Sequence, residues 1–69
     1  MEMQYVDSSN IEMVGYDEGA MELYVQFFGD PTPYVYMNVP AQVHDEFMQS
    51  PSKGSYLNRQ IKGTYDFRR

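Results

Sequence analysis

The alternation of apolar and polar residues over residues 21–28 constrains the fold of this chain more than any other feature. In Met-Glu-Leu-Tyr-Val-Gln-Phe-Phe, the side chains of Leu23, Val25 and Phe27 recur at every second position. A period of two is typical of a β-strand with one buried face. Residues 34–39 resume this alternation after a segment rich in glycine and proline. The sequence therefore predicts two strands separated by a short loop.

These two strands predict an antiparallel hairpin. If Phe28 pairs with Tyr34 across the loop at residues 29–33, every aliphatic side chain of both strands lies on one face. The opposite face then collects Tyr24, Phe28, Tyr34 and Tyr36. We therefore expect an aliphatic face that packs in the core and a tyrosine-rich face that is open to another molecule.

A third strand is predicted over residues 11–16, with its register left open. Either Ile11 and Met13, or Val14 and Tyr16, face the core, and the glycine before Tyr16 is a candidate bulge position.

Two helices are predicted after the strands, over residues 40–49 and 53–63. Pro40 suits a first helical turn, and Ser52 is a typical N-cap. Each helix carries one apolar stripe with residues four positions apart, namely Val43 with Phe47 and Leu57 with Ile61. The predicted fold is an α+β domain: a three-stranded antiparallel sheet followed by two short helices packed on one face, in the order βββαα.

The charges divide unevenly along the 69 residues. Residues 1–52 carry nine acidic side chains and no lysine or arginine, whereas residues 53–69 carry five basic side chains and one acid. A polyanionic partner would therefore meet the C-terminal part of the chain. The alternative is that the basic part neutralises the acidic body within the fold.

The length fits a single small domain over residues 1–69, with ends at residues 1–7 and 66–69 that we expect to be flexible. No apolar run is long enough to span a membrane, and residues 1–5 lack the pattern of a secretory signal. We therefore expect a cytoplasmic protein without membrane contact. The absence of cysteine excludes disulfides and thiolate zinc sites.

An ordered set of short motifs resembles the KTSC domain, a family named for the C-terminus of some lysyl-tRNA synthetases. The set spans residues 7–66 and comprises Ser8-Ser9-Asn10-Ile11, Gly15-Tyr16-Asp17, Leu23-x-Val25-x-Phe27, Tyr34-x-Tyr36, Val39-Pro40 and Ser52-x-Gly54-x-Tyr56-Leu57-Asn58-x-x-Ile61-Lys62. The family also occurs as stand-alone proteins in bacteria and their phages. The resemblance implies a small binding domain and a proposed, unestablished role in RNA binding. This chain departs from the family pattern by inserting Asp30-Pro31-Thr32-Pro33 before Tyr34.

Aromatic and basic residues supply the candidate nucleic-acid-binding site. Two exposed tyrosines on one strand face resemble the stacking platforms of RNA-binding sheets. Basic residues interleaved with aromatic and amide side chains are typical of surfaces that bind single strands. The candidate residues are Tyr34, Tyr36, Lys53, Tyr56, Asn58, Arg59, Lys62 and Arg68. The alternative is that the tyrosines pack within the protein, that Tyr56 is core, and that Asn58 bonds a loop backbone.

Catalysis is not expected, because no motif for a nucleophile or for phosphate binding is present. His44 is the only histidine and stands beside two acids on a helix, so we expect no metal and no cofactor. The sequence predicts a non-catalytic module that binds RNA. Two alternatives remain: a protein-interaction module, such as a phage or mobile-element inhibitor that uses the acidic first half, and a homo-oligomer that pairs through the tyrosine face.

Overall fold

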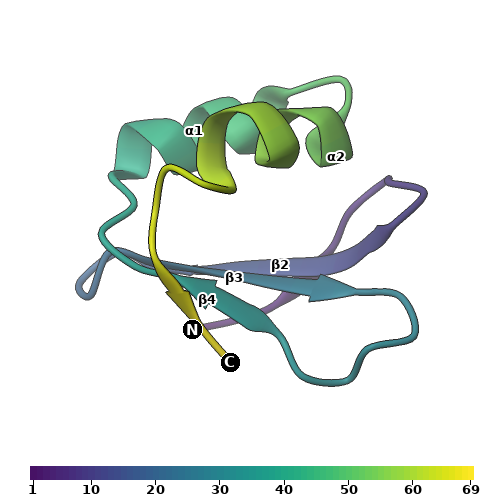
Figure 1. The fold of residues 1–69 in the computed structure, drawn as a ribbon, viewed down its shortest axis with the longest axis horizontal. Coiled ribbons are helices and arrows are strands. Elements are labelled where there is room, and N and C mark those ends of the chain that lie inside the picture. Colours follow the sequence, from purple (N-terminus) through teal and green to yellow (C-terminus); the bar gives the residue numbers. More distant parts are fainter.

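A five-stranded antiparallel sheet and a layer of helices make up the structure (Figure 1). The computed structural model describes residues 1–69. The strands lie in the order β1-β2-β3-β4-β5 and comprise β1 (Gln4–Tyr5), β2 (Ile11–Asp17), β3 (Glu22–Phe27), β4 (Tyr34–Tyr36) and β5 (Phe67–Arg68). The predicted α+β class is confirmed, but the sheet has five strands rather than three. Both ends of the chain, predicted to be flexible, supply a two-residue edge strand.

The helices lie between β4 and β5 in sequence and cover one face of the sheet (Figure 1). Helix α1 spans Ala41–Gln49, with Pro40 as its N-cap rather than within its first turn. Helix α2 (Lys53–Tyr56) continues into the π-helical turn η1 (Leu57–Ile61). Ser52 caps α2 as predicted, because its Oγ accepts the N–H of Ser55 at 3.4 Å. Neither helix is long and apolar enough to cross a membrane.

The register of the β3–β4 hairpin differs from the prediction by three residues. Leu23 is the partner of Tyr36, and Val25 is the partner of Tyr34, whereas the predicted partner of Val25 was Met37. A shift by an odd number of residues moves every side chain of a strand to the other face. Tyr34 and Tyr36 therefore lie on the helix-covered side, and the prediction of a tyrosine-rich open face is wrong.

The loop between β3 and β4 explains this register. The N–H of Asp30 donates to the carbonyl of Phe27 at 3.2 Å, so the chain turns immediately after β3. Pro31 and Pro33 then have no N–H with which to join a ladder. The first residue that can pair again is Tyr34, which by then lies opposite Val25. The turn after Phe27 thus sets the face that carries the tyrosines, because it ends β3 before Phe28 and places Tyr34 opposite Val25.

A bulge in β2 resolves the register that the sequence left open. The pairing of β2 with β3 shifts between Ile11 and Met13 rather than at Gly15. An extra residue changes the phase of the alternation. Ile11 and Val14 are consequently both buried, and Tyr16 packs against them, so each of the two predicted alternatives is right for part of the strand.

The core lies between the sheet and the helices. Nine buried side chains form it: Ile11, Val14, Leu23, Val25, Tyr36, Val39, Phe47, Leu57 and Ile61. Asn38 has φ 61°, and this left-handed kink directs Val39 into the core after β4 has ended. No buried side-chain nitrogen or oxygen lacks a hydrogen-bond partner. The core therefore joins both layers without an unsatisfied polar group.

The core contribution of α1 is tested by Phe47→Ala. Phe47 is 0% exposed, and its truncation should lower the free energy of unfolding by about 3–5 kcal/mol. The matched control is Phe28→Ala, because Phe28 is 55% exposed and the same truncation there should change the free energy by about 0.5 kcal/mol or less. Urea unfolding followed by circular dichroism measures both. Equal losses in the two variants would contradict this account of the core.

A stacked ring pair docks α1 on β2. The rings of His44 and Tyr16 lie 4.4 Å apart at 7°. The hydroxyl of Tyr16 also donates to the carbonyl of Val39 at 2.5 Å. Burial lowers the pKa of His44, and the neighbouring Asp45 partly opposes that effect. Protonation of His44 is therefore less favourable in the folded protein than in the unfolded chain.

This difference makes stability depend on pH. Since the folded state binds the His44 proton more weakly, the free energy of unfolding should fall as the pH drops below the unfolded pKa of about 6.5. In His44→Phe, which keeps a ring against Tyr16, that component should be absent. Urea unfolding between pH 8 and pH 5 compares the two proteins. A stability difference that stays constant with pH, or changes in the opposite direction, would refute the assignment.

Candidate functional site

A cavity of about 540 Å³ opens between the β4–β5 edge of the sheet and η1. Five of its lining side chains are hydrophobic and four are polar, and we refer to these two sets as its floor and its rim. The lining residues are Phe27, Tyr34, Tyr36, Leu57 and Phe67 on the floor, and Asn10, Asp30, Asn58 and Lys62 on the rim. We refer to it as the aromatic pocket. It brings together four of the residues predicted from the sequence: Tyr34, Tyr36, Asn58 and Lys62.

The sheet register assembles the aromatic floor. Tyr34 and Tyr36 are two apart on β4, with ring centroids 6.3 Å apart at 17°. Phe67 lies opposite Tyr36 on β5, and its ring is 5.1 Å from Tyr34 and 5.7 Å from Tyr36. Phe27 meets Tyr34 edge to face at 5.6 Å. The four rings therefore form one packed cluster rather than separate platforms.

The two tyrosines differ in how much of each ring a ligand can reach. Tyr36 is 2% exposed, and its burial, followed by its proximity to Tyr34, raises the pKa of its hydroxyl. Tyr34 is half-buried, and the guanidinium of Arg69 lies over its ring at 4.2 Å from the centroid. Phe67 is 52% exposed. Phe67 is thus the most accessible ring of the cluster, and the predicted exposure of Tyr36 is wrong.

A polar cleft of about 520 Å³ adjoins the aromatic pocket. It lies between the loop at residues 7–10 and the start of α2, and Asn10 and Asn58 line both hollows. A Cβ on Gly54 would lie 2.9 Å from Oδ1 of Asn10, so any larger residue here would displace the side chain of Asn10. The loop itself is held by Ser8, whose Oγ accepts the N–H groups of Asn10 and Ile11. The two hollows share these two asparagines, and we refer to the two hollows together as the groove.

The basic residues near this groove have different environments. Lys62 lines the aromatic pocket, is exposed and takes part in no ion pair. Arg59 stands three positions earlier on η1 and is likewise exposed and unpaired. Lys53 lines the polar cleft, and its Nζ donates to the carbonyl of Ser50 at 3.3 Å. Arg59 and Lys62 are therefore free to meet an anionic ligand.

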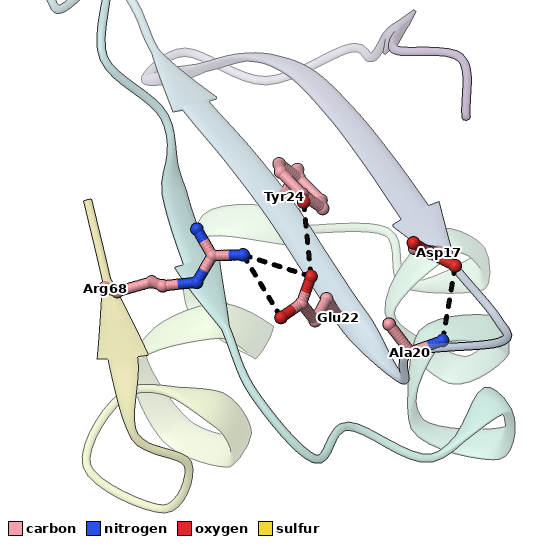
Figure 2. A network of polar contacts seen from close by, with 5 residues as sticks. All are labelled: Asp17, Ala20, Glu22, Tyr24 and Arg68. Carbon is pink, nitrogen blue, oxygen red and sulfur yellow. Dashed lines mark hydrogen bonds and ion pairs between the residues drawn. The ribbon is translucent and has the colours of Figure 1, made fainter.

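Arg68 lies on the opposite side of the sheet, away from the other candidate residues. Figure 2 shows its guanidinium paired with the carboxylate of Glu22, which also accepts a hydrogen bond from the hydroxyl of Tyr24. The hydrogen bond to Glu22 raises the pKa of Arg68. In the sheet, Arg68 is the partner of Val35, whose side chain points away from the helices. The prediction that grouped Arg68 with the helix cations is therefore wrong.

Tyr56 also lies outside the groove. Its ring packs 5.8 Å from that of Phe47, and its hydroxyl donates to Oε1 of Glu46 at 3.0 Å. Partial burial, followed by the contact with Glu46, raises the pKa of Tyr56. Tyr56 thus connects α2 to α1, which matches the structural alternative for this residue.

Five pocket residues were not among the candidates drawn from the sequence: Asn10, Phe27, Asp30, Leu57 and Phe67. Phe27 was assigned to the core, and Phe67 falls in an end predicted to be flexible. Asn10 carried a usable signal, since it is a polar residue of the Ser-Ser-Asn-Ile motif. The pocket depends on long-range pairing of β4 with β5, which local patterns do not reveal.

The fold and the groove define a small α+β domain with an aromatic pocket at the sheet edge. The KTSC domain profile matches residues 7–65. A protein of Tsukamurella paurometabola is 40% identical over 60 residues, which cover 87% of this chain and 88% of that protein. The crystal structure of a KTSC domain protein from Yersinia pestis superposes with a TM-score of 0.92 at 37% identity, covering 99% of this chain and 94% of that one. The chain belongs to the KTSC domain family.

Proposed function

We propose that this protein is a small non-catalytic module that binds single-stranded RNA along the groove formed by the aromatic pocket and the polar cleft. The observation that carries the proposal is the composition of the pocket. It combines an aromatic floor with two amide side chains and an unpaired lysine at its rim. Proteins that bind single strands use aromatic rings for the bases and cations for the phosphates.

The geometry favours one base in the aromatic pocket rather than a stack of bases along the sheet. Tyr36 is buried and Tyr34 has Arg69 over its ring, so neither offers a free face. A base would contact the exposed ring of Phe67 and hydrogen-bond to the amides of Asn10 and Asn58. Stacking of one base is worth about 1–3 kcal/mol, which gives weak binding unless phosphate contacts add to it.

The charges limit and localise those phosphate contacts. The net charge of −5 opposes binding of any polyanion at a random place on the surface. Two cations stand unpaired at this end of the helix layer: Arg59 on η1, and Lys62, which follows η1 and lines the pocket. Two phosphate contacts imply a salt dependence of log K with a slope of only about −1.4 for a single strand.

The cations are tested by Arg59→Gln combined with Lys62→Gln. We expect affinity for a fluorescein-labelled single-stranded RNA of mixed sequence to fall about tenfold at low salt, and the salt slope to approach zero. Fluorescence anisotropy at several salt concentrations measures both quantities. The change to glutamate at both positions should weaken binding further.

A charge-matched control separates local contacts from the overall charge. Gln4→Glu combined with Gln26→Glu lowers the net charge by the same amount but changes β1 and β3, away from the pocket lining. This control should keep most of the affinity. If both double variants weaken binding equally, or if the unmodified protein binds no RNA at low salt, the proposal fails.

A basic protein surface is the second candidate partner. The favouring observation is a hollow of about 430 Å³ beside the His44–Tyr16 stack, lined by the carboxylates of Glu2, Glu18 and Asp45. An acidic surface of this kind speeds association with a basic partner. The homo-oligomer depended on an open tyrosine face, which the observed register removes, so we do not propose it.

A further inference from the structure

We propose that Asp30, Thr32 and Tyr34 form a guanidinium-binding site that Arg69 occupies, and that this contact holds Phe67 in place as a wall of the aromatic pocket. We call the contact the Arg69 latch. Its effect on RNA affinity rests on the proposed function, whereas its existence is a property of the free protein.

Three kinds of group surround the guanidinium of Arg69. Its Cζ lies 4.2 Å from the centroid of the Tyr34 ring, its Nη2 donates to the carbonyl of Thr32 at 3.1 Å, and it forms an ion pair with Asp30. An aromatic face, a carbonyl and a carboxylate together match a planar cation with several N–H donors. A lysine ammonium would keep the charge but could not lie flat on the ring while bonding to both oxygens.

The loop that carries the Asp30 carboxylate and the Thr32 carbonyl is constrained by interactions that do not involve Arg69. Oδ1 of Asp30 accepts the N–H of Thr32 at 3.2 Å. Pro31 and Pro33 fix their own φ angles on either side of Thr32. The carboxylate and the carbonyl therefore need little reordering to receive the guanidinium. Asp30, which closes the turn after β3, thus also belongs to the guanidinium-binding site.

The strand held by the latch has few other contacts. Strand β5 is two residues long, and both of its residues are exposed. The segment passes from the helix layer to the edge of the sheet (Figure 1), where the N–H of Met37 donates to the carbonyl of Asp66 at 2.8 Å. Arg68 and Arg69 anchor the strand from opposite faces of the sheet. Only Arg69 lies on the pocket side with Phe67 and Tyr34.

Arg69→Gln and Asp30→Asn each remove the ion pair and test the latch in the free protein. The asparagine can still accept the Thr32 N–H, so the loop keeps its own hydrogen bond. Proton NMR should show the side-chain δ protons of Arg69 shifted upfield by the Tyr34 ring in the unmodified protein, and this shift should disappear in Asp30→Asn. The ring signals of Tyr34 and Phe67 should move in both variants, and the variant Arg69→Lys should resemble Arg69→Gln.

The matched control is Arg68→Gln, an identical change one residue away. Arg68 pairs with Glu22 on the far face, so its loss should leave the Tyr34 ring signals in place. If Arg68→Gln moves those signals as much as Arg69→Gln does, the strand is held without a specific latch and the inference is overturned. Unshifted Arg69 δ protons in the unmodified protein would overturn it as well.

RNA binding then tests the effect on the pocket. With a labelled single-stranded RNA, we expect Arg69→Gln to weaken binding about three- to tenfold, and Arg68→Gln to weaken it less than twofold. Equal affinities of the unmodified protein and Arg69→Gln would show that the latch does not support the pocket. If neither the unmodified protein nor any variant binds RNA, while the Arg69 δ protons of the unmodified protein are shifted upfield as expected, the proposed function is contradicted but the Arg69 latch is supported.

Discussion

The hydrogen-bonded pairing of β3 with β4 determines where every other feature of this protein lies. Because Val25 stands opposite Tyr34 and Leu23 opposite Tyr36, the tyrosines of β4 point toward the helices. On that side the ring of Tyr34 packs against the rings of Phe27 and Phe67. A slip by one residue would place both tyrosines in solvent and leave η1 without an aromatic floor to face.

The pocket that results draws on distant parts of the chain. Asn10 comes from a loop before β2, Asp30 from the loop after β3, and Asn58 from η1, while Phe67 belongs to the short edge strand β5. Asn10, Asp30 and Asn58 lie on segments that are held by core packing or by a tight turn. The wall formed by β5 depends on two residues of pairing and on ion pairs at the surface. Elements with few buried contacts open most readily, so β5 is the part of the site most able to move.

Local patterns in the sequence were sufficient for most of the fold. The alternation at Leu23, Val25 and Phe27 located β3, and the spacing of Val43 with Phe47 located α1. The hairpin register was not predictable from alternation alone, because both faces of β4 are apolar enough to be buried. The missing information is the turn closed by the N–H of Asp30 on the carbonyl of Phe27, which ends β3 before Phe28 and leaves no trace in the alternation.

The site was predictable only in part, for a related reason. Asn58 and Lys62 could be named as candidates because amide and basic side chains are interleaved with aromatic residues in this part of the sequence. Arg68 and Arg69 are adjacent in sequence but anchor β5 from opposite faces of the sheet, and no composition argument separates them. Phe67 entered the site through the pairing of β5 with β4, which joins residues about thirty positions apart. Long-range pairing of short strands is the information that a single sequence lacks.

The central claim is that the helix-covered side of the sheet edge, rather than its open face, receives the ligand. The most direct test is a titration of ¹⁵N-labelled protein with a short single-stranded RNA, followed by amide and side-chain chemical shifts. The account predicts that the largest changes occur at Asn10, Asn58, Lys62 and Phe67. Changes centred on Tyr24, Gln26 and Arg68, on the opposite face, would contradict it.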